Sequence, residues 1–277
     1  MNGPLAPADL PALGAEVALL DVRLESEFAA GHLRGSGHLP ADELLPRRAE
    51  LPPRDMAVAV LAASAEQARR AAQALESMGY AEVGWLAAPL ASTATLELEA
   101  GPPARLWRPA PFLVERIDEL PRGLAADLAA GSGREAAFLA ERGFTVEAWD
   151  AAPEALERAA DLARRAGAEL RTVVADLERG RPPLPESRYA LVTCFRFLHR
   201  PLFPAMARAL IPGGHLVYET YRVGQEKFGR PKRPQYLLED GELARSFQSL
   251  GLEVLRYEEP SPSRGPITAR LWARRPA

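Results

Sequence analysis

Short apolar runs alternate with amphipathic stretches along the second half of the chain, which is the pattern of an α/β protein. One helix is expected after a turn of small residues, ending near Gly143, and Pro153 opens the next at the preferred first-turn position. Apolar runs predict strands at residues 124–127, 144–149, 169–175, 189–194, 215–220, 252–258 and 268–274, and further helices at 153–166, 202–210 and 242–250. This alternation predicts a doubly wound sheet.

The first hundred residues repeat the alternation on a smaller scale. Apolar runs predict strands at residues 17–22, 56–61 and 81–86. A short helix is expected to start at Glu25, and a longer one at residues 68–78 is stopped by a glycine. Strands and helices that alternate in this way predict a small parallel α/β sheet.

A proline-rich stretch separates the two patterns. Residues 87–111 contain five prolines and lose the periodicity of either half, which is typical of a linker. We therefore expect two domains, residues 1–100 and 101–277, with the boundary near Gly101. The charge supports this division, because residues 1–100 carry 14 acids against 7 bases (net −7) and residues 101–277 carry 23 acids against 27 bases (net +4).

Composition narrows the class of protein. Of 277 residues, 47% are hydrophobic and 26% charged, which describes a globular chain. No apolar run reaches the roughly 20 residues of a membrane helix, and we expect no signal peptide. The single cysteine, Cys194, permits neither an internal disulfide nor a multi-cysteine zinc site and fits the reducing cytoplasm. The weak positive balance of the second half argues against nucleic-acid binding.

The most informative motif is DLAAGSGREAAFLAERGFTVEAWD, which runs from Asp127 to Asp150. It predicts a strand, a glycine turn, a helix and a second strand that ends in an acid, the unit that holds a nucleoside at the carboxyl ends of parallel strands. Gly131 and Gly133 fit the dinucleotide pattern G-x-G-x-x-[GA], and Asp150 stands 19 residues beyond Gly131. No second mononucleotide half follows, however. Instead, a Pro-Gly-Gly turn at residues 212–214 leads to a fifth strand and two closing strands.

This order resembles class I S-adenosylmethionine-dependent methyltransferases, and the likeness covers about residues 105–277. The family's first motif, acid-x-Gly-x-Gly-x-Gly, corresponds here to Asp127-x-Ala129-x-Gly131-x-Gly133. The resemblance implies a Rossmann-like, seven-stranded sheet with a reversed last strand and S-adenosyl-L-methionine as cofactor. The stretches DLAAGSGREAAFLAERGFTVEAWDAAPEALERA and FRFLHRPLFPAMARALIPGGHLVYETY are similar to bacterial tellurite-resistance-type methyltransferases in particular.

The resemblance also implies which residues hold the cofactor. The turn from Ala129 to Gly133 would contact the methionine moiety and the ribose. Asp150 would accept hydrogen bonds from the ribose hydroxyls, because one carboxylate accepts two donors; its alternative role is to cap the following helix. Asp176 with Leu177 would hold the adenine, and Phe195 would border the site.

Four side chains after the fourth and fifth strands are the candidates for catalysis. Arg196 could attract an oxyanion, and His199 could act as a base near neutral pH. Glu219 and Tyr221 leave the fifth strand at the mouth of the site, where alternation points about half of the residues inward. A soft anionic acceptor would need no base, because methyl transfer from a sulfonium depends mainly on positioning and desolvation. Residues 222–236 carry five cations against one acid and predict either a solvated loop or a flap that draws in an anionic substrate.

The first hundred residues resemble the rhodanese (sulfurtransferase) domain over about residues 5–95. DVRLESEFAAGHLRGSGHLP is close to that family's opening motif, and VAVLAASAEQARRAAQALESMGY is similar to its strand, active loop and helix. The family's persulfide-carrying cysteine falls at Ala62 here. Because a thiolate is the nucleophile in that chemistry, we expect sulfur transfer to be lost. His32 and His38 are expected to pack their loop rather than to bind a metal.

We therefore predict a bacterial, cytoplasmic S-adenosylmethionine-dependent methyltransferase (EC 2.1.1.-) with a catalytically inactive rhodanese-like module. The acceptor is expected to be a small molecule, such as a metalloid oxyanion, a thiol or another small anion, and no metal is expected. The rhodanese-like module is left as a scaffold, a homodimer surface or a protein-partner surface. A non-catalytic cofactor-binding regulatory protein is the alternative from another class. An NAD-dependent oxidoreductase is disfavoured by the closing strands, and an active sulfurtransferase by Ala62.

Overall fold

The computed structural model describes residues 2–14, 16–87, 97–179, 184–260 and 266–277. Contacts divide the chain into two compact units, Met1–Arg108 and Pro109–Ala277. The division falls after Gly101, where the sequence places the boundary, because the end of the linker stays with the first unit. Ala104 donates its backbone N–H to the carbonyl of Ser36 (3.0 Å), and Leu106 is buried in the first unit's core. Residues 88–96 of the predicted linker lie outside the described residues.

The first unit is built on a small parallel sheet, as predicted. Its elements are β1 (Gly3–Pro4), η1 (Pro7–Ala12), β2 (Val17–Asp21), α1 (Glu25–Ala30), β3 (His32–Leu33), β4 (Gly37–His38), η2 (Arg48–Glu50), β5 (Ala57–Ala62), α2 (Ala65–Ser77), β6 (Val83–Ala87) and β7 (Leu98–Glu99). The sheet has the order β1-β6-β5-β2-β4 with parallel pairing throughout, and β3 and β7 form a separate antiparallel pair. Helix α2 buries Ala68, Ala71, Ala72 and Leu75, which helical spacing places on one face.

The second unit contains the predicted seven-stranded sheet. Its elements are α3 (Pro111–Val114), β8 (Leu124–Leu128), α4 (Arg134–Glu141), β9 (Thr145–Asp150), α5 (Pro153–Arg165), β10 (Arg171–Val174), β11 (Tyr189–Phe195), η4 (Arg200–Leu202), α6 (Phe203–Ala209), β12 (Leu210–Tyr221), η5 (Gln225–Lys227), η6 (Pro234–Tyr236), α7 (Glu242–Ser249), β13 (Glu253–Glu258) and β14 (Thr268–Arg274). The order is β10-β9-β8-β11-β12-β14-β13, and β14 runs antiparallel to both of its neighbours. The prediction of a reversed last strand is therefore confirmed.

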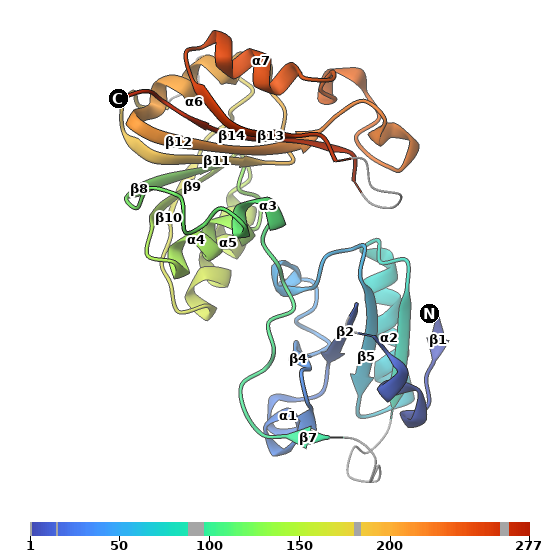
Figure 1. Cartoon of the computed structure of the whole chain (residues 1–277). Helices are drawn as coiled ribbons and strands as arrows, with labels where there is room; N and C mark the ends of the chain where they lie inside the picture. The colour runs from blue at the N-terminus through green and yellow to red at the C-terminus, as the bar shows by residue number, and fades with distance from the viewer. Residues whose placement is uncertain (1, 15, 88–96, 180–183, 261–265) are drawn as a thin grey trace. The chain divides into compact units, whose positions relative to one another are not determined.

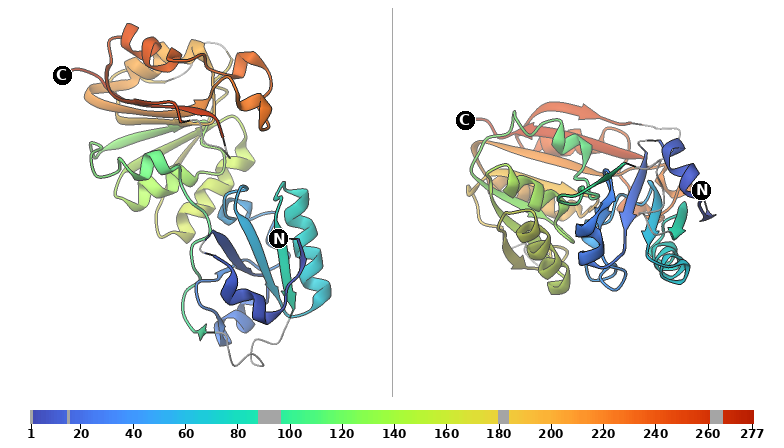
Figure 2. Two further views of the ribbon diagram at one scale, coloured as in Figure 1. Left: turned by 45° about the vertical axis from the view of Figure 1, so that its right-hand side comes forward. Right: turned by 90° about the horizontal axis from the view of Figure 1, so that it is seen from below.

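Helices cover both faces of this sheet. Figure 1 shows α4 and α5 on one face and α6 and α7 on the other, and Figure 2 shows the same layers from two further sides. Every residue of β11 is buried, as expected of a central parallel strand between two helical layers. On the α6–α7 face, Phe203 and Phe247 pack against Tyr218 of β12 with ring centroids 5.9 and 6.0 Å from the tyrosine ring. In the described part of the chain, no helix combines the length and apolar character needed to span a membrane.

Candidate active site

The predicted cofactor residues gather at one edge of the second unit's sheet. Asp127, Asp150 and Phe195 lie at the carboxyl ends of β8, β9 and β11, and Asp176 follows β10. These four strands are neighbours in the order β10-β9-β8-β11 and run parallel. The connection direction reverses between β8 and β11, and in open α/β sheets the crevice outside such a switch point is where ligands bind.

Three residues of the turn after β8 have a left-handed backbone: Ala129, Gly131 and Gly133. Gly131 has a φ of 55° and donates its N–H to Asp150 Oδ2 (2.8 Å). At the place where a Cβ of Gly131 would stand, no heavy atom lies within 4 Å, so the turn faces open space there. Ala129 has a φ of 54°, a conformation that costs a non-glycine residue about 1–2 kcal/mol. Backbone strain of this kind concentrates at functional sites.

The second glycine of the turn has a different role. Gly133 has a φ of 75° and begins α4, and a Cβ built on it would stand 2.4 Å from the Cβ of Ala159 in α5. The G-x-G spacing therefore combines one glycine that faces open space with one that permits close packing of two helices. Only Gly131 has room for a ligand beside it.

Asp150 connects the turn to the next strand. Its Oδ2 accepts from the Gly131 N–H and its Oδ1 from the Ala152 N–H (2.9 Å). Each oxygen keeps a second lone pair for a ligand hydroxyl. Asp176, by contrast, is exposed: it accepts from the Glu178 N–H (3.0 Å) and pairs with Arg179 (3.2 Å).

Asp127 is a buried carboxyl group with one unsatisfied oxygen. Its Oδ1 accepts from Thr193 Oγ1 (2.7 Å), whereas Oδ2 has no hydrogen-bond partner among the described residues. Burial raises the pKa of Asp127 to about 8, and the nearby charge of Glu135 adds to the shift. A buried polar atom without a partner is costly unless a ligand supplies one. This orphan oxygen, together with the open side of Gly131, fits a cofactor that brings hydrogen-bonding groups to the turn.

Arg196 follows β11 in a left-handed conformation (φ 57°) and is held from two sides. Its backbone N–H donates to the carbonyl of Glu219 (2.8 Å), and its guanidinium pairs with Glu135 (3.1 Å). Glu135 is buried at the start of α4 and also accepts from the Ala110 N–H (3.3 Å). Sequence reasoning missed Glu135, because an acid in a first helical turn normally faces solvent and gives no sign of a partner 61 residues away.

A cleft of about 700 Å³ opens at the ends of β11 and β12. Of the four predicted catalytic residues, Arg196 and Tyr221 line it. The other lining residues are Glu178, Phe197, Leu198, Thr220, Arg230, Pro231, Lys232, Arg233 and Tyr236. The hydroxyl of Thr220 is buried and has no hydrogen-bond partner among the described residues. The cation-rich composition of residues 222–236 was the sequence signal for the wall formed by residues 230–236.

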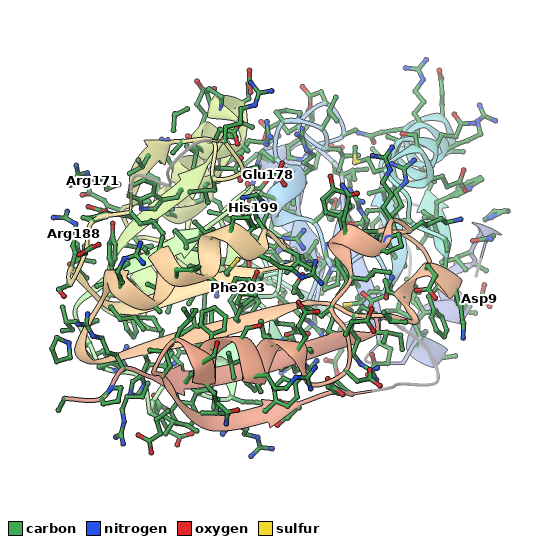
Figure 3. All side chains as sticks on the ribbon, turned by 90° about the horizontal axis from the view of Figure 1, so that it is seen from above. Asp9, Arg171, Glu178, Arg188, His199 and Phe203 are labelled. Carbon is green, nitrogen blue, oxygen red and sulfur yellow. The ribbon has the colours of Figure 1, made fainter. Side chains whose placement is uncertain are left out.

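The other two predicted catalytic residues do not line this cleft. Glu219 is buried, and its Oε1 accepts from Thr268 Oγ1 (2.9 Å) and Arg270 Nε (3.0 Å) on β14. His199 is half-buried at the start of η4. Figure 3 shows His199 and Glu178 away from Arg171 and Arg188, which mark the amino ends of β10 and β11. His199 is therefore at the carboxyl edge without being part of the cleft wall.

The first unit has its own loop at the end of a central strand. Ala62 ends β5, and the Ala63 N–H that follows donates to Gln67 Oε1 (3.0 Å). Gln67 also donates from Nε2 to the carbonyl of Val22 (3.0 Å) and from its N–H to Ser64 Oγ (3.2 Å). The Gln67 side chain thus occupies the loop, and neither a thiol nor a cation stands in residues 62–67.

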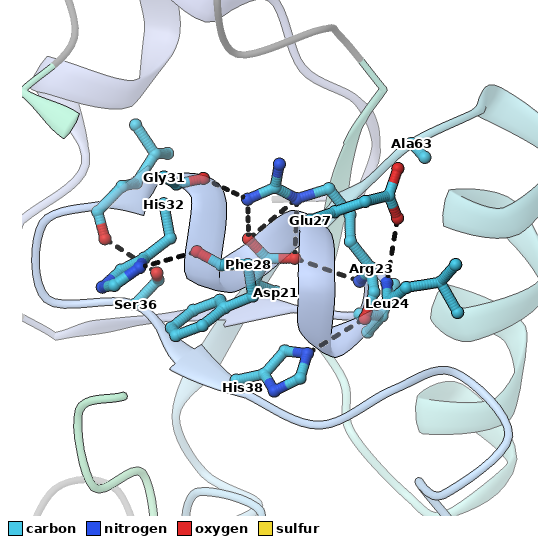
Figure 4. A network of polar contacts seen from close by, with 12 residues as sticks. Asp21, Arg23, Leu24, Glu27, Phe28, Gly31, His32, Ser36, His38 and Ala63 are labelled. Carbon is cyan, nitrogen blue, oxygen red and sulfur yellow. Dashed lines mark hydrogen bonds and ion pairs between the residues drawn. The ribbon is translucent and has the colours of Figure 1, made fainter. Parts of the chain in front are cut away.

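His32 and His38 stack on the two sides of one phenylalanine. The rings of His32 and His38 lie 3.7 and 4.5 Å from the Phe28 ring, centroid to centroid. His38 also contacts the carbonyl of Arg23 (3.0 Å), and Arg23 in turn pairs with the buried Asp21 (2.7 Å). Figure 4 shows these side chains as one polar network beside α1. Both rings therefore serve the packing of this loop.

Comparisons with known proteins divide the chain in the same way. The model of the rhodanese-like domain matches residues 8–88, and that of the methyltransferase domain matches residues 125–214. An uncharacterized protein of Schizosaccharomyces pombe is 25% identical over 83% of this chain and 84% of its own length. Because 83% exceeds the share of either unit, that match reaches into both.

Solved structures resemble the chain at low sequence identity. TehB from Haemophilus influenzae is 16% identical with a TM-score of 0.50, over 59% of this chain and 61% of TehB, so the match spans about three fifths of TehB. An S-adenosylmethionine-dependent methyltransferase from Mesorhizobium loti is 21% identical (TM-score 0.47; 60% of this chain, 98% of that one). Magnesium protoporphyrin IX methyltransferase from Synechocystis, with bound S-adenosylhomocysteine, is 17% identical (TM-score 0.47; 58% and 78%).

The chain thus joins a rhodanese-like domain to a methyltransferase domain. The predictions of a methyltransferase and of its fold are confirmed.

Proposed function

We propose that the second unit transfers a methyl group from S-adenosylmethionine to a small anionic molecule bound in the cleft at the ends of β11 and β12. The observation that carries this proposal is the position of the cleft. Arg196, which lines it, follows β11, and β11 pairs with β8, whose end carries Asp127 and the open turn at Gly131. A cofactor at the turn and an acceptor in the cleft would therefore meet at the end of β11.

The cofactor side of this proposal assigns a task to each acid. Asp150 would accept hydrogen bonds from the ribose hydroxyls while it keeps the Gly131 N–H. The orphan Oδ2 of Asp127 would form a hydrogen bond with the methionine moiety, and Leu177 beside Asp176 would contact the adenine. When bound, S-adenosylmethionine supplies an electrophilic methyl group. Both electrons of the broken C–S bond stay on the sulfur, and the acceptor provides the electron pair of the new bond.

The acceptor side depends on charge and on exclusion of water. Arg196, Arg230, Lys232 and Arg233 line the cleft against a single acid, Glu178, so the cleft favours an anion. An acceptor whose nucleophilic atom is already ionised forms the new bond with its lone pair and releases no proton. A neutral hydroxyl, thiol or amine would pass its proton to solvent or to a base.

The other three predicted catalytic residues, Glu219, Tyr221 and His199, have different roles in this proposal. Tyr221 lines the cleft and would contact the acceptor directly. Glu219 would hold the rim together, since its carboxylate binds β14 and its carbonyl holds the Arg196 N–H. His199 would act only through an intervening group, and His199→Gln is therefore expected to keep most of the kcat.

Calorimetry with S-adenosylhomocysteine tests the cofactor site. We expect micromolar binding by the wild type and at least about a hundredfold loss in Asp150→Ala, because two charge-assisted hydrogen bonds of about 1.5–3 kcal/mol are removed. Asp150→Asn keeps an acceptor for the Gly131 N–H. A loss of affinity in this variant would therefore come from the ribose contacts and not from collapse of the turn. Asp118→Ala, which changes an exposed acid, is the control. A wild-type chain that does not bind S-adenosylhomocysteine would contradict the proposal.

Transfer itself is tested by incubating the chain with methyl-labelled S-adenosylmethionine and candidate acceptors. The panel holds selenite, tellurite, thiols and organic anions, and labelled product is detected by mass spectrometry. Normal cofactor binding with no labelled product would favour the regulatory alternative.

We further propose that the first unit has no sulfurtransferase activity and contributes a scaffold or partner surface. Ala62 offers no thiol, and Gln67 satisfies the loop's polar groups internally. Thiosulfate-dependent turnover by the wild type would contradict this assignment.

A further inference from the structure

Within the described ranges of the chain, three cations on the cleft wall lack an acidic partner, whereas three arginines near them each have one. Arg196, Arg200 and Arg222 each pair with an acid: Glu135 (3.1 Å), Glu242 (2.5 Å) and Asp240 (2.9 Å). Arg230, Lys232 and Arg233 line the cleft and have no ion-pair partner within 4.0 Å among the residues that the structure describes. Three adjacent cations without a partner provide a site for a negatively charged group.

The wall that carries these cations is fastened to the rest of the unit. The buried side chain of Gln225 donates to the carbonyl of Arg230 (3.3 Å) and accepts from the Ile267 N–H (2.8 Å). Arg200 donates to the carbonyls of Gln235 (2.9 Å) and Leu237 (2.8 Å), the two neighbours of Tyr236. The backbone at Arg230 and on both sides of Tyr236 is therefore fixed at the cleft before a ligand arrives, which lowers the entropic cost of binding.

The cleft is too large and too apolar for a bare oxyanion. Its volume of about 700 Å³ lies in the range of sites for drug-sized molecules. An oxyanion of four heavy atoms needs only the room of about three water molecules, roughly 100 Å³. Phe197, Leu198, Tyr221 and Tyr236 supply aromatic and aliphatic surface that such an ion cannot use.

We propose that the methyl acceptor is an organic anion, with an apolar or aromatic body and a carboxylate or phosphate group. This inference rests on the methyltransferase function proposed above. The body lies against Phe197, Leu198 and the two tyrosines, and Arg230, Lys232 and Arg233 bind the anionic group. A nucleophilic atom elsewhere on the body donates its lone pair to the methyl carbon as the C–S bond breaks, and any proton on that atom goes to solvent. The anionic group is an anchor and is unchanged by the reaction.

Binding of simple probes to the full-length chain, with and without S-adenosylhomocysteine, tests the inference. The probes are phenyl phosphate, benzoate and inorganic phosphate, measured by calorimetry at two salt concentrations. We expect at least one aromatic anion to bind about tenfold or more tightly than inorganic phosphate, and to weaken with salt. Phenyl phosphate and benzoate distinguish a phosphate anchor from a carboxylate anchor.

Charge-removing variants locate the site. The double variant Lys232→Gln/Arg233→Gln should lose about tenfold or more in affinity for the aromatic anion and keep its affinity for S-adenosylhomocysteine. Lys227→Gln, an exposed cation on the same segment that does not line the cleft, is the matched control and should change neither affinity.

Two results would overturn the inference. One is that inorganic phosphate binds as tightly as both aromatic anions, which would indicate a small oxyanion site. The other is that the double variant binds the aromatic anion as the wild type does. If S-adenosylhomocysteine does not bind while the aromatic anion still binds at Lys232 and Arg233, the proposed methyltransferase function fails and the anion site stands.

Discussion

The two units place a loop in equivalent positions, after a central parallel strand and ahead of a helix, and treat its polar groups in opposite ways. After β5, the Gln67 side chain bonds the Ala63 N–H and the Val22 carbonyl, and Ser64 caps α2. After β8, the turn leaves Asp127 Oδ2 unsatisfied and Gly131 facing open space. A loop that satisfies itself needs no ligand, whereas one with a buried orphan group is completed by a ligand. The first loop is thus closed by its own side chains, whereas the second is open to a ligand.

The largest effect is expected where the turn after β8 meets α5. Gly133→Ala should lower the free energy of unfolding by about 3 kcal/mol, because overpacking against Ala159 adds to the strain of a left-handed alanine. Gly131→Ala should cost only about 1 kcal/mol of stability, from backbone strain alone, but should weaken S-adenosylhomocysteine binding. Denaturant unfolding and calorimetry measure the two effects. Equal destabilisation by both substitutions would remove the distinction between a packing glycine and a ligand-facing glycine.

The buried carboxyl group of Asp127 should make stability depend on pH. Its folded-state pKa of about 8 lies above that of an unfolded aspartate, near 3.9. Between these values the folded state keeps a proton that the unfolded chain has released. The stabilisation is therefore complete below about pH 4 and is lost as the pH rises toward 8, at up to about 1.4 kcal/mol per pH unit.

Asp127→Asn cannot ionise and should remove this slope. Between pH 5.5 and 7.5 the variant should lose about 2 kcal/mol less stability than the wild type, measured by urea unfolding at each pH. Asp118→Asn, at an exposed position, should follow the wild-type curve. Parallel curves for wild type and Asp127→Asn would show that the carboxyl group is ionised in the folded state.

The closed loop of the first unit predicts a smaller effect. Gln67→Ala removes two side-chain hydrogen bonds from a partly exposed loop and should lower the free energy of unfolding by about 1 kcal/mol. Gln73→Ala, on an exposed position of α2, should change stability by less than about 0.5 kcal/mol. If Gln67→Ala is as stable as the wild type, the loop is not held by its own side chains and the contrast with the turn after β8 weakens.

The smallest effect is a gain in stability. Ala129→Gly relieves a left-handed alanine but makes the unfolded chain more flexible, so the net gain should be about 0.5 kcal/mol. Ala130→Gly, at a neighbour without positive φ, should instead lose about 0.5–1 kcal/mol. Thermal unfolding of the two variants measures the difference. Changes of the same sign would argue against strain at Ala129.

Most of the fold could be predicted because its signals are local. The apolar run at residues 189–194 agrees with β11 to within one residue, and the helical periodicity at residues 153–166 agrees equally well with α5. Each run reflects the burial of one element. An element that is buried on one face has apolar residues at the spacing of a strand or of a helix, and this spacing is visible in a short stretch of sequence. The order of elements then restricts the topology, since parallel strands need helical crossovers.

The sequence by itself determined which residue types stand at the carboxyl ends of the parallel strands. Asp127, Gly131 and Asp150 occur one after another at a strand end, a turn and the next strand end, and the ends of parallel strands meet at one edge. The absence of a thiol at Ala62 was likewise visible in the sequence. These conclusions needed only residue type and position in an element.

The tertiary structure decided which side chains share the site. It paired Arg196 with Glu135, 61 residues away, and used Arg200 to hold a wall 35 and 37 residues further along the chain. It also left Glu219 and His199 outside the cleft wall and assigned the two glycines of one motif to different tasks. Such outcomes depend on which distant element a side chain meets, and periodicity along the chain carries no record of that partner.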